Sequence, residues 1–142
     1  MVEIRKASVD DAKGIVNLSA QLGYKTDVNN VIERISKIEK DVNNCICVAV
    51  IEETVVGWVQ GVYSIRLESM EFVEITGLVV DVRYRKMNIG RKLIDEVLKW
   101  AKPFQVEKVK VRCNTIRTES HKFYEKSGFK LIKEQKIFEI EL

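Results

Sequence analysis

Apolar and polar positions follow two different periods along this chain. Val2–Lys6 alternates residue by residue, which predicts a strand. From Ser8 to about Leu22 the spacing becomes that of a helix, which Ser8 can cap and Gly23 ends. A second helical pattern spans about Val28 to Lys40. The N-terminal third therefore predicts one strand followed by two helices.

The middle of the chain predicts strands. Three β-branched, apolar runs cover Cys45–Ile51, Thr54–Ile65 and about Met70 to Val80. Glu52 and Glu53 would form the tight turn between the first two, although they lack the usual Asn-Gly chemistry.

The C-terminal third returns to mixed elements. It predicts an amphipathic helix from about Ile89 that ends before Pro103, a short strand over Lys108–Arg112, a helix over Thr118–Lys126 that Ser127-Gly128 stops, and one or two strands in the tail Phe129–Leu142. With no repeat and no linker, the pattern predicts one α+β domain over residues 1–142. Its central sheet is expected to be mixed and mainly antiparallel, with about four flanking helices.

Composition narrows the class of protein. The 142 residues are 46% hydrophobic and 32% charged, which is typical of a globular domain with a real core. No apolar run approaches the roughly 20 residues that cross a bilayer, and the charged start is not a signal peptide, so we expect a cytoplasmic protein without membrane partners. A net charge of +3 is too small to indicate a nucleic-acid partner.

Cysteine and histidine give no metal signature. Three cysteines and one histidine, without a Cys-x-x-Cys pair, make a zinc site improbable, and we expect no metal. Cys45 and Cys47 share one strand face and read as buried free thiols. Cys113 could in principle act as a covalent nucleophile, but nothing in the sequence activates it.

The most informative segment is a basic turn. A strand ends at Val80, a helix begins near Ile89, and the segment carries Arg83, Arg85, Lys86, Arg91 and Lys92. A helix start offers unpaired N–H groups and partial positive charge, so this arrangement can hold a phosphate. The alternative is a solvated basic patch.

Two motifs carry a resemblance to a known family. The first is Arg85-Lys86-Met87-Asn88-Ile89-Gly90, and the second is Asn114 followed by Phe123-Tyr124-Glu125-Lys126-Ser127-Gly128-Phe129. Together, in this order and on these elements, they resemble the GNAT superfamily of acetyl-CoA-dependent N-acetyltransferases. The resemblance covers essentially the whole chain in element order. Two positions depart from the family pattern: Asn88 stands where the signature has its first glycine, and Arg117 stands where many relatives have asparagine. If that glycine position needs a positive φ, asparagine is the best-tolerated substitute; if it needs a close approach of the backbone to phosphate, the Asn88 side chain would crowd the ligand.

The resemblance implies a cofactor site for acetyl-CoA. The backbone amides of Met87 to Lys92 would point at the pyrophosphate, the strand around Leu78 would bind the pantetheine arm by its backbone, and an amide of that strand could stabilise the developing oxyanion. Gly77 supports a bulge or close approach there. The implied cofactor-binding residues are Leu78, Val79, Val80, Arg85, Lys86, Met87, Asn88, Ile89, Gly90, Arg91, Lys92, Asn114 and Tyr124. For Asn114, a simple turn role is the alternative.

Tyr124 resembles the family's general acid. Its task would be to help the departing thiolate of CoA. A free thiol has a pKa near ~8.5 and tyrosine near ~10, so full proton transfer is uphill by roughly 2 kcal/mol, and a strong hydrogen bond with late transfer is easier. The alternative is a core tyrosine that packs beside Phe123.

Glu74 is the candidate general base, because an alkylammonium with a pKa near ~10.4 must lose a proton before it attacks. By strand alternation it shares one face with Leu78 and Val80. Ordered water as the base, or a purely structural Glu74, are the alternatives. His121 lies three residues before Tyr124 on the same side of a helix and reads mainly as a surface or packing residue.

These expectations combine into one function. The protein would transfer the acetyl group of acetyl-CoA to a primary amine by direct attack in a ternary complex. The acceptor stays open: the loop between the first two helices carries Gln21, Tyr24, Lys25 and Asp27, which do not choose between a small amine, an amino sugar and a peptide. Rival hypotheses are a non-catalytic acetyl-CoA-binding regulatory module and a nucleic-acid-binding domain. The tail Lys136–Leu142 looks like an edge strand that could pair in a homodimer.

Overall fold

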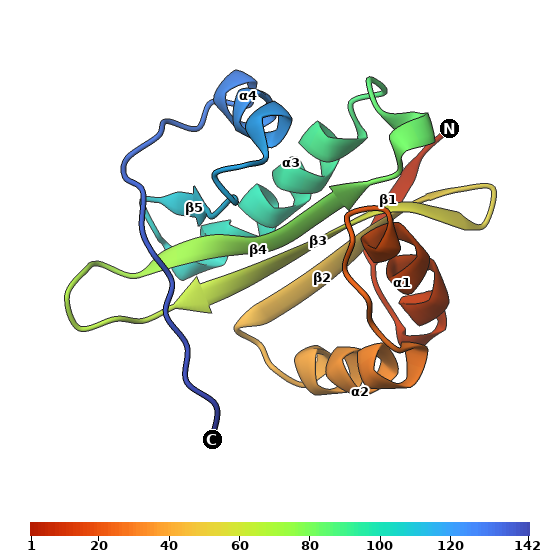
Figure 1. The fold of residues 1–142 in the computed structure, drawn as a ribbon, viewed down its shortest axis with the longest axis horizontal. Coiled ribbons are helices and arrows are strands. Elements are labelled where there is room, and N and C mark those ends of the chain that lie inside the picture. Colours follow the sequence, from red (N-terminus) through yellow and green to blue (C-terminus); the bar gives the residue numbers. More distant parts are fainter. The chain divides into compact units, whose positions relative to one another are not determined.

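The computed structural model describes all 142 residues and separates into two compact units, Met1–Val111 and Arg112–Leu142. The first unit contains the whole sheet and three of the four α-helices (Figure 1). The second contains the last helix and the C-terminal tail. The expectation of a single domain over residues 1–142 stays a prediction.

The sheet of the first unit has five strands in the order β1-β2-β3-β4-β5. They are β1 (Glu3–Lys6), β2 (Asn44–Ile51), β3 (Thr54–Ser64), β4 (Phe72–Val80) and β5 (Val109–Val111). Neighbours run antiparallel except β4 and β5, which run parallel. This confirms the predicted mixed, mainly antiparallel sheet, and each strand lies where the apolar pattern placed it.

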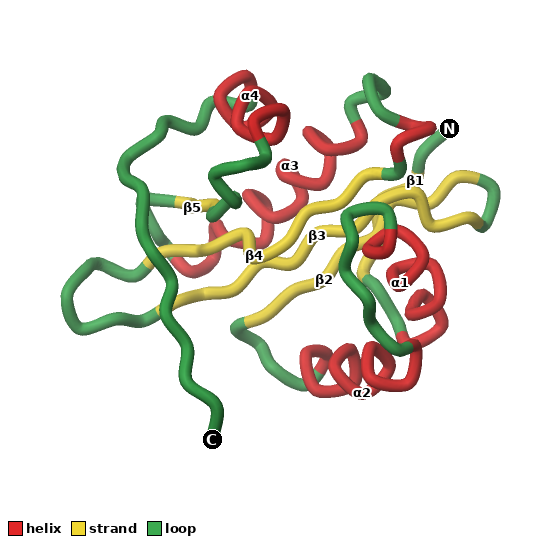
Figure 2. The backbone as a smooth tube through the Cα atoms, viewed as in Figure 1, coloured by secondary structure: helices red, strands yellow, loops and turns green.

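Four α-helices accompany the sheet, as predicted. They are α1 (Ala12–Ala20), α2 (Val28–Glu39), α3 (Ile89–Ala101) and α4 (Thr118–Lys126). Short 3-10 turns cover Val9–Asp11, Val82–Tyr84 and Lys102–Phe104. The helix expected from Ser8 therefore begins as a tighter turn and becomes α-helical at Ala12. Figure 2 shows the helices, strands and connecting loops in separate colours.

The two faces of the sheet carry different helices (Figure 1). On one face, Ile15 of α1 and Ile35 of α2 pack in one apolar cluster with Val48 of β2. On the other face, α3 approaches β3 closely: a Cβ built on Gly57 would lie 3.2 Å from Leu93 Cδ1 and 3.3 Å from Ile89 Cγ2. Glycine at this position therefore brings the first turn of α3 down onto the sheet.

Cys45 and Cys47 lie on the α3 side of β2. Both are free and buried, which confirms their reading as structural thiols. Burial raises the pKa of Cys45 to about 11 and that of Cys47 to about 12. Neither thiol is therefore ionised near neutral pH.

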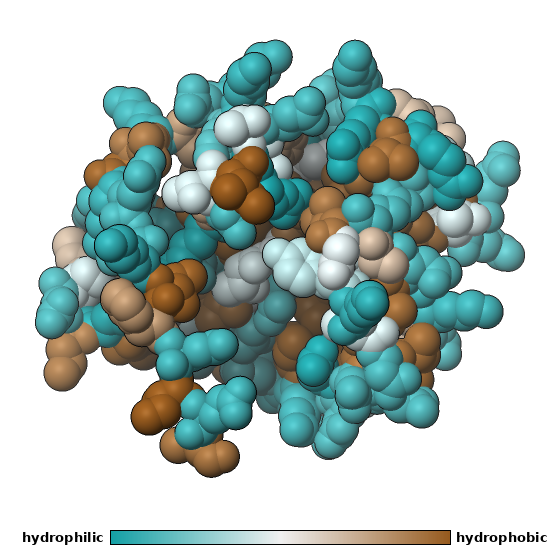
Figure 3. All heavy atoms as spheres, in the orientation of Figure 1, coloured by the Kyte–Doolittle hydropathy of each residue, from teal (hydrophilic) through white to brown (hydrophobic).

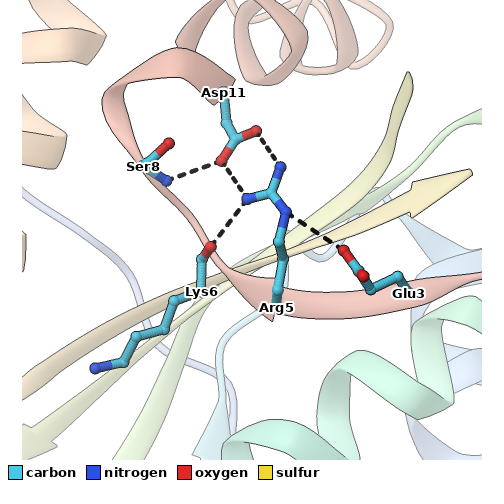
Figure 4. A network of polar contacts seen from close by, with 5 residues as sticks. All are labelled: Glu3, Arg5, Lys6, Ser8 and Asp11. Carbon is cyan, nitrogen blue, oxygen red and sulfur yellow. Dashed lines mark hydrogen bonds and ion pairs between the residues drawn. The ribbon is translucent and has the colours of Figure 1, made fainter. Parts of the chain in front are cut away.

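An ion pair joins β1 to the turn before α1 (Figure 4). Arg5 Nη1 and Nη2 each donate to one carboxylate oxygen of Asp11, both at 2.8 Å, and the Ser8 N–H donates to Asp11 Oδ2 at 2.8 Å. Burial opposes ionisation of Asp11, which is 5% exposed, but these hydrogen bonds outweigh it and the pKa of Asp11 is lowered. The carboxylate thus fixes where the chain turns from strand to helix.

A bulge in β4 changes which residues share a face. Gln60 pairs with Gly77 whereas Gly61 pairs with Ile75, so Thr76 is an extra residue in β4. Residues on opposite sides of a bulge no longer follow simple alternation. The inference that Glu74 shares a face with Leu78 and Val80 is therefore wrong.

The cross-strand partners show the actual faces. Glu74 pairs with Val62 and Gly77 with Gln60, on the face that carries α1 and α2. Leu78 pairs with Val59 and Val80 with Gly57, on the face that carries α3.

The C-terminal tail does not form the one or two strands predicted for Phe129–Leu142. Residues 129–142 have no regular secondary structure, although several apolar side chains are exposed: Leu131, Ile132, Ile137, Phe138, Ile140 and Leu142. The alternating pattern is real, but a strand exists only when a neighbouring strand accepts and donates its backbone hydrogen bonds.

The face seen in Figure 3 is mostly hydrophilic, with apolar groups in separate patches. None of the helices combines the length and the apolar character that spanning a bilayer requires. The cytoplasmic location stays a prediction.

Candidate functional site

The open edge of β4 is the first element of the site. β5 pairs with β4 only at Val73, Glu74 and Ile75, so the rest of β4 has no strand on that side. Asp81 N–H donates to Val56 O of β3 at 2.8 Å. Because alternate residues of an antiparallel strand point to the same edge, Leu78 and Val80 direct their N–H and C=O groups away from β3. This edge can accept an extended amide chain in the manner of an added strand.

Val79 has a different role. It lies in register with Trp58 of β3, and its backbone polar groups point toward that strand. Its side chain is 5% exposed. Of the three predicted pantetheine-binding residues in β4, Val79 is thus the one whose backbone N–H and C=O groups face β3 and not the open edge.

The turn after β4 is built on the buried carboxylate of Asp81, which is 2% exposed. Asp81 Oδ1 accepts from Arg83 N at 2.9 Å and from Arg83 Nε at 3.2 Å, and Oδ2 accepts from Arg83 Nη2 at 3.0 Å. The Arg83 hydrogen bond lowers the pKa of Asp81 against the opposing effect of burial. Arg83 therefore neutralises a carboxylate of the turn and adds little net charge for a ligand.

Gln21 connects α1 to the same turn. Its Oε1 accepts from Val82 N–H at 3.1 Å. From the sequence, Gln21 was named only as a residue of the loop between the first two helices, and Asp81 was not singled out, so the structural role of both residues in this turn was missed. The only signal for Asp81 was an acidic residue directly before a basic run.

Asn88 adopts a left-handed conformation, with φ 59° and ψ 18°. The sequence posed this alternative: asparagine is well tolerated if the first glycine position of the motif needs positive φ. Lys86 also has a positive φ of 69°. The motif backbone therefore takes up two left-handed residues without any glycine at those positions.

The first turn of α3 offers fewer free amides than predicted. Asn88 caps the helix, and Lys92 N–H donates to Asn88 O at 3.0 Å. An α-helix leaves only the amides before its first i to i−4 bond without partners inside the helix, so those of Ile89, Gly90 and Arg91 remain. The expectation that the Lys92 amide points at a pyrophosphate is wrong, and only its side chain stays a candidate.

The cationic side chains of the turn differ in their surroundings. Arg85, Lys86 and Lys92 are exposed. Arg91 Nε lies 3.0 Å from Asp95 Oδ1, in a pair four residues apart along α3. Met87 is 52% exposed, whereas Ile89 and Gly90 are buried at the contact of α3 with the sheet.

Glu74 lies on the face of β4 opposite to Leu78. Its side chain is 14% exposed, and Arg66 Nη2 lies 3.7 Å from Glu74 Oε1. Lys110 of β5 is its register partner. The candidate base is thus a largely buried carboxylate beside a guanidinium, and no sequence pattern indicated that Arg66 would lie there.

In the second unit, Asn114 organises the segment before α4. Its Oδ1 accepts from Ile116 N–H at 3.1 Å, which is the turn role considered as the alternative. His121 Nε2 lies 2.9 Å from the Asn114 backbone carbonyl. Because a carbonyl oxygen only accepts, this nitrogen must carry the proton. His121 therefore holds Asn114 rather than standing as a free surface side chain.

Tyr124 lies near the end of α4 among aromatic rings. Its ring centroid is 5.2 Å from that of Phe123 and 5.7 Å from that of Phe129, both in edge arrangements. Burial raises the pKa of Tyr124 to about 12, with a smaller contribution from Cys113. Gly128, at φ 100°, ends the helix and lets Phe129 N–H donate to Tyr124 O at 3.0 Å.

Comparison with known proteins decides the family. The model of the acetyltransferase (GNAT) family matches residues 17–129, which includes both motifs. The chain belongs to the GNAT family. Its members are acyltransferases, and the GNAT protein described here is accordingly assigned to that enzyme class. A search of curated proteins finds no match.

Solved structures share the fold of this GNAT protein. A transcriptional regulator from Bacillus halodurans C-125 is 23% identical with a TM-score of 0.88, covering 99% of this chain and 100% of its own. The aminoglycoside N-acetyltransferase AAC(6')-Iy in complex with CoA is 15% identical with a TM-score of 0.87, covering 100% and 96%. Glucosamine-6-phosphate N-acetyltransferase from Arabidopsis thaliana is 24% identical with a TM-score of 0.82, covering 98% and 99%. At these identities the similarity establishes the fold.

Proposed function

We propose that this protein transfers the acetyl group of acetyl-CoA to a primary amine by direct attack in a ternary complex. The observation that carries the proposal is that two binding features follow each other along the chain. The open edge of β4 at Leu78 and Val80 is followed directly by the basic turn and by the free amides at the start of α3. One surface can therefore hold an amide-containing arm and a pyrophosphate in sequence.

The residues fit acetyl-CoA, which supplies an activated thioester when bound. Leu78 and Val80 bind the pantetheine amides, and the amides of Ile89, Gly90 and Arg91 face the pyrophosphate at the positive end of α3. Arg85, Lys86 and Lys92 contribute cationic side chains, and the backbone amides of Met87 and Asn88 come directly before those of the helix. Val79 keeps this part of β4 in the sheet. The family resemblance adds Asn114 and Tyr124 of the second unit to the cofactor-binding residues. The solved relative AAC(6')-Iy in complex with CoA supports this choice of cofactor.

The chemistry needs a base and an acid. Glu74, directly or through water, takes a proton from the acceptor ammonium, and the amine nitrogen then attacks the thioester carbonyl. As the carbon–sulfur bond breaks, the second proton leaves the nitrogen, and the departing sulfur gains a proton, so that the products are an amide and free CoA thiol. Tyr124 donates a hydrogen bond to the leaving sulfur. The pKa of Tyr124 is raised to about 12 in the free protein. Complete proton transfer from Tyr124 to the thiolate is therefore less favourable than it would be from a tyrosine with the ordinary pKa near ~10, which favours a late transfer.

The first test is thermal unfolding with and without acetyl-CoA, with ATP and NAD as controls. Ligand at about 100 times its Kd adds roughly 2.7 kcal/mol, which is several degrees for a domain of this size. Specific stabilisation followed by thiol release with a panel of amines supports the proposal. Stabilisation without turnover on any amine supports the non-catalytic regulatory module instead, and no stabilisation at millimolar acetyl-CoA contradicts both.

We also propose a homodimer in which the tail of one chain supplies a strand to its partner. The exposed apolar side chains of the tail, which include Ile137, Phe138 and Ile140, support this. Light scattering after size exclusion tests it: a dimer that becomes monomeric on deletion of residues 136–142 supports the proposal, and a monomeric full chain contradicts it.

A further inference from the structure

We propose that the acceptor carries an anionic group, a carboxylate or a phosphate, close to its amine, and that Arg66 and Lys110 bind that group. This inference rests on the proposed function and names its substrate class. It follows from a side-chain cluster around the candidate base that acetyl transfer as such does not require.

Arg66 is held in place by three contacts. Its Nε donates to Ser64 Oγ at 3.2 Å, its Cζ lies 5.1 Å from the centre of the Phe72 ring, and its Nη2 lies 3.7 Å from Glu74 Oε1. The side chain is still 49% exposed. A guanidinium has five N–H donors in a fixed fork, so donors remain for a ligand oxygen on the exposed side.

Lys110 approaches the same ring from β5. Its Nζ lies 4.2 Å from the centre of the Phe72 ring. Because Lys110 is the register partner of Glu74, and Phe72 lies two residues before Glu74, all three side chains are on one face of the sheet. Phe72 is 2% exposed, so its ring is a fixed support that both cations contact.

The charges of this cluster are unequal. It contains two cations, Arg66 and Lys110, for one carboxylate, Glu74. An acceptor that offers only an ammonium group is attracted by Glu74 but repelled by the other two. An acceptor with an anion beside its amine can use all three, because the amine approaches Glu74 while the anion binds the cations. The cluster therefore favours zwitterionic acceptors over simple amines.

Matched acceptors test the inference and separate the two anions. The rate of thiol release from acetyl-CoA is measured with L-tyrosine against tyramine, which differ by one carboxylate, and with glucosamine 6-phosphate against glucosamine. We expect the anionic member of at least one pair to have a kcat/KM about tenfold higher or more, mainly through KM. The pair that shows the preference identifies the anion.

Variants assign the preference to the cluster. Arg66→Gln and Lys110→Gln should each lower the anionic-to-neutral ratio about tenfold, and Arg66→Lys should retain part of it. Lys99→Gln on α3, where the lysine side chain is 73% exposed, is the control and should keep the parental ratio. A parental preference for the neutral members, or unchanged ratios in both glutamine variants, overturns the inference while acetyl transfer itself stands.

Failure of the proposed function has a different signature. If acetyl-CoA stabilises the protein but no amine is acetylated, the transferase proposal fails and calorimetric titration of L-tyrosine and glucosamine 6-phosphate into the acetyl-CoA-loaded protein decides the inference. Binding that weakens in Arg66→Gln and Lys110→Gln supports the anion site. No binding, or binding unaffected by both substitutions, overturns it.

Discussion

Gly77 of β4 lies against the indole ring of Trp58 in β3. A Cβ built on Gly77 would be 2.6 Å from Trp58 Cη2 and 2.8 Å from Cζ3, closer than real Cβ contacts. The two residues belong to the face that carries α1 and α2, directly beside the bulge at Thr76. Glycine is therefore needed at position 77 because the indole ring of Trp58 packs against it. The bulge that the sequence suggested as the reason for this glycine lies at the neighbouring residue, Thr76.

Gly77→Ala should destabilise the protein by about 1–3 kcal/mol, because the indole must move to admit a methyl group. Urea unfolding measures the change. The matched experiment repeats Gly77→Ala in a Trp58→Leu protein, where it should lower the free energy of unfolding much less, because the indole ring is absent. Equal costs in both backgrounds would show that the indole contact is not the cause.

Asn88→Val should destabilise the protein by about 1–2 kcal/mol, because the left-handed conformation at φ 59° brings the Cβ of a β-branched residue too close to the backbone carbonyl oxygen. Asn88→Gly should leave stability within about 1 kcal/mol and bind acetyl-CoA at least as tightly, since it removes a side chain beside the free amides. Calorimetry of both variants gives stability and Kd. Met87→Val is the control, because Met87 is exposed and is not among the positive-φ residues. A fully stable Asn88→Val protein would contradict the strain argument.

Tyr124→Phe should lower kcat about 10²-fold with little change in the KM for acetyl-CoA, because it removes a proton donor needed only as the sulfur leaves. With its pKa raised to about 12, Tyr124 stays protonated through the assay range, so the pH profile of the variant should keep the parental shape below about pH 10. Tyr63→Phe, whose ring stacks on Phe104 at 4.4 Å, is the control and should retain activity. Unchanged turnover in Tyr124→Phe would remove the acid role.

The Asp11–Arg5 pair should make stability depend on pH at the acidic end. Because the pKa of Asp11 is lower in the folded than in the unfolded protein, its contribution is complete above the unfolded value near ~3.9 and is lost as pH falls through the folded value. Asp11→Asn should cost about 2 kcal/mol at pH 7 and progressively less toward pH 2. Asp10→Asn, at an exposed position, should change little. A cost for Asp11→Asn that is the same at both pH values would refute the linkage.

Much of the fold could be predicted because its signals are local. The four helices and five strands lie where the apolar periods placed them, and the left-handed position of Asn88 was one of two alternatives that the motif itself posed. The tail was mispredicted for the opposite reason: its alternation shows an affinity for sheet structure, but a strand also needs a partner edge, which a single sequence does not display.

The amino-acid sequence by itself determined the element order, the basic turn before α3 and the two motifs that place the chain in its family. Only the tertiary structure decided the bulge at Thr76, the open edge of β4 beyond Ile75 and the position of Arg66 beside Glu74. The physical reason is the range of the interactions. Helical periods and turn conformations depend on neighbours a few residues away, whereas strand register and the face that a side chain occupies depend on a partner strand distant in sequence.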